Sequence, residues 1–117
     1  AADNMVPYGY TDVKEQFKIQ KMANEIVKKN DKYDSYKDEK KKEYMKRAIK
    51  QARNTKEFID SPGIKEIVHD PSKQEDYIKA EIKSRGINDE NSAEAQKIKK
   101  GYENAFNSAA VWERINK

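Results

Sequence analysis

The sequence predicts an all-α fold: a small bundle of four main helices plus one short helix, with antiparallel neighbours. Apolar residues recur at three- and four-residue steps, the period of one side of a helix. No segment combines sustained two-residue alternation with hairpin turns, which argues against a sheet. The loops between the periodic segments are short, and short loops favour antiparallel neighbours.

The composition is that of a folded, highly charged chain. Of its 117 residues, 39% are charged and 35% are hydrophobic, yet the net charge is only +4. A low net charge together with 9% aromatic residues separates the chain from disordered sequences. It has no cysteine, which excludes disulfides and cysteine-based zinc sites. No apolar run approaches the 18 residues that a transmembrane helix needs.

The length predicts one domain, which we place at residues 12–117 after an extended arm at residues 1–11. The first residues, Ala1-Ala2-Asp3, resemble the mature end left by signal-peptide cleavage, and this favours a secreted or periplasmic protein. The alternative is that residues 1–4 are a vector remnant, in which case the protein is cytoplasmic.

The first half of the domain predicts two long helices. One spans about 12–29, capped by Thr11 or Asp12. The other begins after a cap at Ser35 and extends as far as Asp60. Their apolar stripes are Ile19, Met22, Ala23, Ile26 and Val27 in the first, and Tyr44, Met45, Ala48, Ile49 and Ala52 in the second.

Two cap-plus-proline signals predict the next helices. Ser61 followed by Pro62 predicts the start of a short helix over 64–69. Asp70 followed by Pro71 predicts a helix over about 71–85. Gly86 then predicts a left-handed C-terminal cap, after which Ile87 would touch Ile82.

The last helix is predicted over about 92–115, with Asn91 as its cap. Gly101 in its middle suggests a close helix crossing, because glycine otherwise costs a helix about 1 kcal/mol. We expect Tyr44, Tyr77, Tyr102 and Trp112 in the core. The stripe on this last helix consists of Ala95, Ile98, Tyr102, Ala105, Ala109 and Trp112.

The sequence contains no constellation that specifies catalysis. His69 is the only histidine, and Asp70 beside it would allow a general-base pair. Such a pair needs a nucleophile or a metal that the sequence does not supply, so we interpret His69 as a surface or capping residue. Carboxylates one turn apart, such as Glu39 and Glu43, are typical of a solvated helix face. We therefore expect no enzyme, no cofactor and no metal site.

The second helix has a basic face that is a candidate binding surface. Its cations share or flank one side of the helix, opposite the alanines of the apolar stripe. They would suit the phosphates of a nucleic acid or an acidic surface; the alternative is an ordinary solvated lysine-rich face. The face consists of Lys42, Lys46, Arg47, Lys50, Arg53 and Lys56.

Four tyrosines lie outside the helical stripes and are candidate contacts for a protein, because tyrosine is enriched at interfaces. They are Tyr8, Tyr10, Tyr33 and Tyr36. The function we expect is a non-enzymatic helical module that binds another macromolecule, in the first place a protein. The alternative is a basic protein that contacts nucleic acid through the Lys42–Lys56 helix face.

Overall fold

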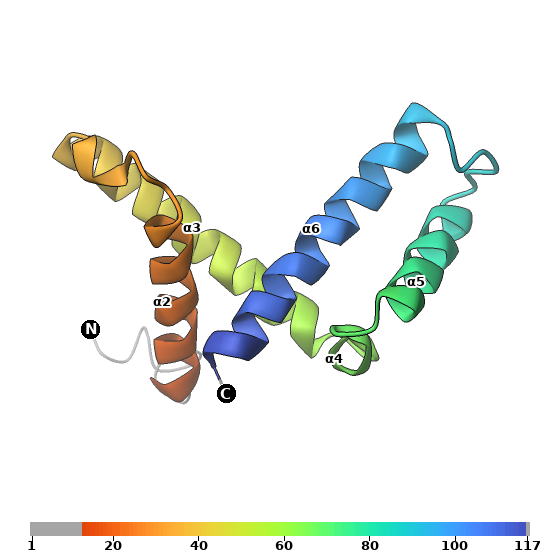
Figure 1. The fold of residues 1–117 in the computed structure, drawn as a ribbon, viewed down its shortest axis with the longest axis horizontal. Helices are drawn as coiled ribbons and strands as arrows, with labels where there is room; N and C mark the ends of the chain where they lie inside the picture. The colour runs from red at the N-terminus through yellow and green to blue at the C-terminus, as the bar shows by residue number, and fades with distance from the viewer. Residues whose placement is uncertain (1–12, 117) are drawn as a thin grey trace, which may run out of the picture. The chain divides into compact units, whose positions relative to one another are not determined.

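The computed structural model describes residues 13–116, and the regular structure in that range is entirely helical. The predicted all-α fold of four main helices and one short helix is confirmed (Figure 1). The predicted N-terminal arm and the cap at Thr11 or Asp12 lie outside the described residues. The helices are α2 (Val13–Lys28), α3 (Asp38–Asp60), α4 (Ile64–Ile67), α5 (Pro71–Ser84) and α6 (Ala93–Ile115), with a 3₁₀ turn, η2 (Tyr33–Ser35), before α3.

The described chain groups into two compact units, which we describe separately. The first contains residues 13–56 together with 115–116, and the second contains Glu57–Arg114. The assignment of 12–117 to a single domain stays a prediction.

In the first unit, α2 and α3 pack antiparallel. Glu15 near the start of α2 forms an ion pair at 3.3 Å with Lys56, late in α3. Further along α2, Gln20 Nε2 lies 4.0 Å from Met45 Sδ, early in α3. The buried positions of α3 in this unit are occupied by small residues. The buried side chains of this unit are Met22, Ala23, Ala48, Ala52 and Thr55.

In the second unit, α5 and α6 lie side by side and antiparallel (Figure 1). The ring of Tyr77 on α5 contacts both Phe106 and Tyr102 on α6, with centroids 5.8 and 5.6 Å apart. One turn further along α5, Glu81 accepts a hydrogen bond from Tyr102. The predicted burial of Trp112 is confirmed. The buried side chains here are Ile59, Ile64, Val68, Ile78, Ile82, Ala95, Phe106, Ala109 and Trp112.

The predicted signals around α5 are confirmed. Asp70 accepts a hydrogen bond from the Lys73 backbone N–H at 3.2 Å, and Pro71 occupies the first turn. After Ser84, Gly86 has a φ of 78°, the left-handed conformation expected of a glycine cap, and its N–H donates to the Lys83 carbonyl.

Three predicted caps are wrong: two serines bond within the preceding turn, and a neighbouring serine replaces the asparagine. Ser35 belongs to η2, where its hydroxyl donates to the Lys32 carbonyl. Ser61 continues the last turn of α3 and donates to the Glu57 carbonyl, so α4 begins only after Gly63. At α6 the cap is Ser92 instead of Asn91, since Ser92 Oγ accepts from the Ala95 N–H at 3.1 Å.

The close helix crossing expected at Gly101 is also wrong. Gly101 is exposed, and a Cβ built there would meet nothing within 4 Å. Its presence in α6 therefore lowers helix stability without a packing benefit.

Candidate functional site

The basic face of α3 is an extended charged surface of the first unit. Lys42, Lys46, Lys50 and Arg53 are exposed and lie on the side of α3 opposite Ala48, at 100° per residue. Exposed Arg47 flanks them. At 1.5 Å per residue, the face from Lys42 to Arg53 is about 16 Å long.

The acids near this face neutralise little of it. Lys46 Nζ lies 3.9 Å from Glu43, with both side chains more than 60% exposed, so the pair is screened by water. Lys56 does not belong to the face, although the sequence placed it there. It is half-buried, and its ion pair with Glu15 turns it toward α2.

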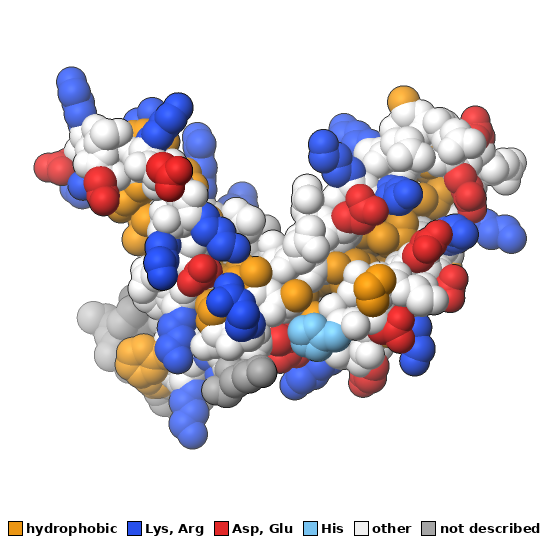
Figure 2. All heavy atoms as spheres, in the orientation of Figure 1, with side chains coloured by type: hydrophobic (Ala, Val, Ile, Leu, Met, Phe, Trp, Pro, Cys, Tyr) orange, Lys and Arg blue, Asp and Glu red, His pale blue; other side chains and the backbone are white. Residues whose placement is uncertain are grey.

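The first unit as a whole is strongly basic. Its described residues contain fifteen lysines and arginines against seven acids, a net charge of +8. The second unit contains nine basic and twelve acidic residues, a net charge of −3. Figure 2 shows Lys and Arg side chains spread over α2 and α3. The net charge of the whole chain is small because the positive charge of the first unit is partly cancelled by the negative charge of the second. The composition of the whole chain did not show this division.

Of the four tyrosines expected at the surface, the structure describes two. Tyr33 and Tyr36 are half-buried and pack on each other and on Tyr44, with centroids 5.7 to 6.2 Å apart. Asn30 donates a hydrogen bond to Tyr36 Oη at 3.1 Å. These rings stabilise the turn between α2 and α3 and leave only part of their area to a partner. Tyr8 and Tyr10 lie outside the described residues.

The lysines at the start of α3 cover this tyrosine cluster. Lys40 Nζ lies 4.1 Å from the centroid of the Tyr36 ring, and Lys41 Nζ lies 5.6 Å from that of Tyr33. Both distances allow a cation–π attraction.

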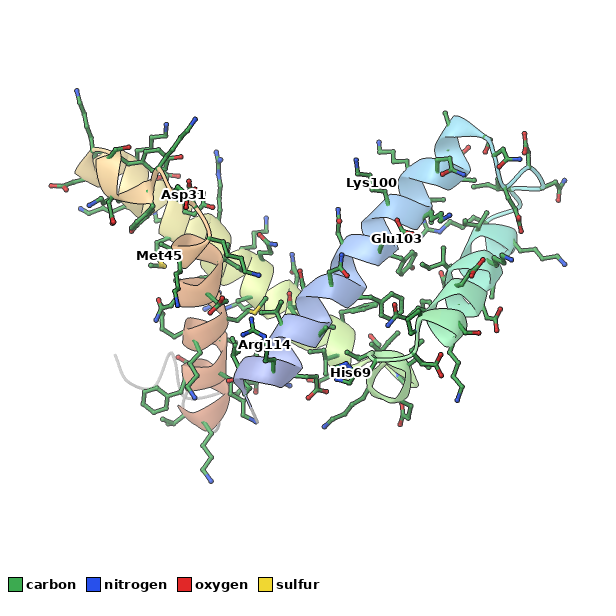
Figure 3. The ribbon with its side chains drawn as sticks, viewed as in Figure 1. Asp31, Met45, His69, Lys100, Glu103 and Arg114 are labelled. Carbon is green, nitrogen blue, oxygen red and sulfur yellow. The ribbon has the colours of Figure 1, made fainter. Side chains whose placement is uncertain are left out.

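His69 lies at the junction between α4 and α5, and its side chain is exposed (Figure 3). The carboxylate of Asp70 beside it caps α5. Among the residues that the structure describes, no group of three His, Cys, Asp or Glu side chains is arranged to hold a metal ion. From the sequence we interpret His69 as a surface or capping residue. In the structure Asp70 provides the cap of α5, and His69 lies at the surface.

Sequence reasoning missed an exposed apolar pair on α2. Phe17 is 66% exposed and Val13, one turn before it, is 55% exposed. Phe17 lies on the side of α2 opposite the buried Met22 and Ala23.

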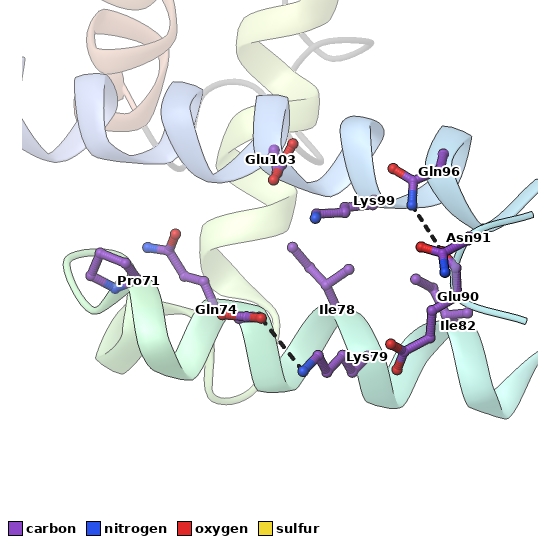
Figure 4. A pocket seen from close by; sticks show the side chains of 11 residues that line it. Pro71, Gln74, Ile78, Lys79, Ile82, Glu90, Asn91, Gln96, Lys99 and Glu103 are labelled. Atoms are coloured by element: carbon purple, nitrogen blue, oxygen red, sulfur yellow. Dashed lines mark hydrogen bonds and ion pairs between the residues drawn. The ribbon is translucent and has the colours of Figure 1, made fainter. Parts of the chain in front are cut away.

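A cleft of about 420 Å³ runs between α5 and α6 beside the loop that joins them (Figure 4). Its floor is formed by buried Ile78 and Ile82, and its rim is polar with charges of both signs. Several rim groups are already bonded: Lys79 pairs with Glu75 at 3.5 Å, and Gln96 donates to the Glu90 carbonyl. The rest of the lining consists of Pro71, Gln74, Asn91, Lys99 and Glu103.

The charged groups of the cleft are exposed to solvent. The cleft is therefore a solvent-exposed groove with an apolar floor and a polar rim.

The groups whose pKa values shift lie beside this cleft, at Tyr77 and Tyr102. Burial raises the pKa of Tyr102 above its ordinary value, and Glu81, which accepts its hydrogen bond at 3.2 Å, raises it further. Arg85 acts in the opposite direction. Burial also raises the pKa of Tyr77. Both phenols therefore stay protonated, which is the behaviour of structural tyrosines and not of activated nucleophiles or bases.

Comparisons with known proteins assign no family to this chain. No protein-family model matches it, and neither the curated proteins nor the solved structures gave a match. None of the described helices is long and apolar enough to cross a membrane. The functional argument therefore depends on the surfaces described above.

Proposed function

We propose that this chain is a non-enzymatic helical module that binds an acidic partner protein through the basic face of α3. The observation that supports the proposal is the exposure of five cations, Lys42, Lys46, Arg47, Lys50 and Arg53, along one side of a single helix. The helix fixes their spacing, so a matching acidic surface meets a preorganised array instead of flexible single charges.

The extent of the face favours a protein over a long polyanion. Glu39 lies before the face, Glu43 lies between Lys42 and Lys46, and Glu57 lies beyond Arg53, all exposed. These acids limit the uninterrupted positive stretch, from Lys46 to Arg53, to about 10 Å, and they would repel a phosphate backbone that continued past either end. Two of the five cations are arginines, the basic residue that is enriched in protein interfaces.

The environment of His69 supports the non-enzymatic part of the proposal. The imidazole is exposed to solvent, and the carboxylate of Asp70 beside it is engaged in capping α5.

Nucleic acid is the second candidate partner, and the net charge of +8 in the first unit favours it. The two candidates differ in their dependence on salt. For duplex DNA, the logarithm of the binding constant falls with the logarithm of salt concentration, with a slope of about 0.9 per neutralised phosphate.

The proposal is tested by crosslinking pull-down from nuclease-treated extract of the native host, using the wild type and two variants. The test variant is K46E/K50E/R53E on the α3 face. The control is K65E/K73E/K97E, which changes the net charge equally at three exposed lysines of the second unit. Circular dichroism confirms that each variant remains helical.

We expect the wild type and the control to capture the same acidic protein, and the α3 variant to lose it. With the purified partner, the α3 variant should bind at least roughly tenfold more weakly, because like charges then face each other. Equal binding by all three proteins would refute the proposal. Binding to duplex DNA with a steep salt slope, lost in the α3 variant, would instead support the nucleic-acid candidate. A location outside the cytoplasm stays a prediction, and fractionation of the native host tests it.

A further inference from the structure

We propose that the outward side of α2 binds an anionic lipid bilayer, with Phe17 and Val13 inserted between the head groups. This inference does not depend on the proposed partner of α3. It concerns the opposite side of the α2–α3 pair, because Phe17 lies opposite Met22 and Ala23, which α2 buries.

The first argument is the exposure of two large apolar side chains next to each other on one helix. Phe17 and Val13 are one helical turn apart, so their side chains are neighbours on the same side of α2. They are the large apolar side chains recorded as exposed in the described chain, at 66% and 55%. A bilayer interface offers an aromatic ring a favourable site at head-group depth.

The second argument is the charge around this pair. Exposed Lys14, Lys18 and Lys21 lie within about 100° of Phe17 around the helix axis. The acids of α2, Glu15 and Glu25, are half-buried, and Glu15 is bonded to Lys56. Each lysine near an anionic surface contributes attraction, and its long aliphatic stem lets the ammonium reach the phosphates while the ring inserts.

The residue types favour lipid over the other possible partners. Lysine is depleted in protein interfaces relative to arginine, and the cations on this side of α2 are all lysines. Nucleic acid would use the lysines but would gain nothing from exposed Phe17 and Val13. The mixture of lysine with a small apolar group is the composition of interfacial helices.

The test is co-sedimentation of the full chain with vesicles of phosphatidylcholine alone and with vesicles that contain about 30% phosphatidylserine. The variants are F17A, K14E/K18E/K21E, and the control K65E/K73E/K97E. Phe17 is exposed and makes little packing contribution, so F17A is expected to fold normally, and circular dichroism checks this.

We expect the wild type to sediment with the anionic vesicles at low salt and to stay in solution with neutral ones. F17A should weaken binding roughly tenfold, since it removes the inserted ring. The α2 lysine variant should abolish binding, and the control should retain most of it.

Three results would overturn the inference. One is absence of binding to anionic vesicles at low salt. Another is F17A binding as tightly as the wild type, which would mean that charge alone attracts the chain. The third is failure to bind vesicles while F17A weakens the capture of a protein in the pull-down above, which would make this side of α2 a protein contact.

Discussion

Gly101 and Gly86 show how the same residue type has opposite effects at two positions. Gly86 follows α5 with a φ of 78°, where a side chain would be strained. Gly101 lies inside α6 with open space around the position of a Cβ. The first glycine is required by the backbone, while the second weakens a helix through the extra conformational freedom of its unfolded state.

We expect Gly101→Ala to raise the free energy of unfolding by about 0.5–1 kcal/mol, because alanine restricts the unfolded chain and meets no neighbour in the folded one. Gly86→Ala is the matched control and should lower the free energy of unfolding by about 1–2 kcal/mol through left-handed strain. Urea denaturation followed at 222 nm measures both. A destabilising Gly101→Ala would mean that a neighbour does approach α6 there.

Among the helices, α4 has an importance that its length does not suggest. It has only four residues, yet Ile64 is completely buried and Val68 follows it into the core of the second unit. The side chain of Gln74 on α5 donates to the carbonyls of Ile67 and Val68 at 2.8 and 2.7 Å. The Ile67 carbonyl also accepts from the Asp70 N–H at 3.1 Å, so the Gln74 amide adds a second bond there and bonds the next carbonyl as well, which fixes α4 against α5.

Ile64→Ala should therefore lower the free energy of unfolding by about 2–5 kcal/mol, because it leaves a cavity beneath α4. Ile64→Val should cost only about 0.5–1.5 kcal/mol and keeps the protein folded for comparison. Ile67 in the same helix is only half-buried, so Ile67→Ala is the control and should lower the free energy of unfolding by less than Ile64→Ala. Equal losses at both positions in urea denaturation would contradict the packing described for Ile64.

At the scale of the whole molecule, charge is divided unequally. The first unit has a net charge of +8 in its described residues and the second has −3. Like charges on α2 and α3 repel one another, and only a few acids of that unit offset them. The basic surface thus lowers the stability of the unit that has it, which is a common cost of a charged binding surface.

Raising the salt concentration from about 10 to 150 mM should slow hydrogen exchange in residues 13–56 by a factor of roughly two to ten. The Debye length falls over this range from about 30 to 8 Å, and this screens repulsion between the lysines. Exchange within Glu57–Arg114 should change less, because its charges nearly balance. Equal slowing in both units, measured by mass spectrometry, would contradict the division of charge.

The sequence by itself determined the helices and several of their ends. Apolar periodicity located α2, α3, α5 and α6, because a side chain must be buried every three or four residues whatever its partner. The Asp70-Pro71 and Gly86 signals are equally local, since an aspartate caps the turn that follows it and a left-handed residue favours glycine. The positions of the α3 cations followed from the same periodicity.

Only the tertiary structure decided which groups meet. More than one nearby backbone group can form a hydrogen bond with the side chains of Ser35, Ser61 and Asn91. The path of the turn decides which of these bonds forms. Lys56 is paired because the antiparallel packing of α2 on α3 brings Glu15 to it. Phe17 is exposed because α2 buries its other side. For Lys56 and Phe17 the outcome depends on residues distant in sequence, and a local pattern does not identify which distant residues will lie beside a given side chain.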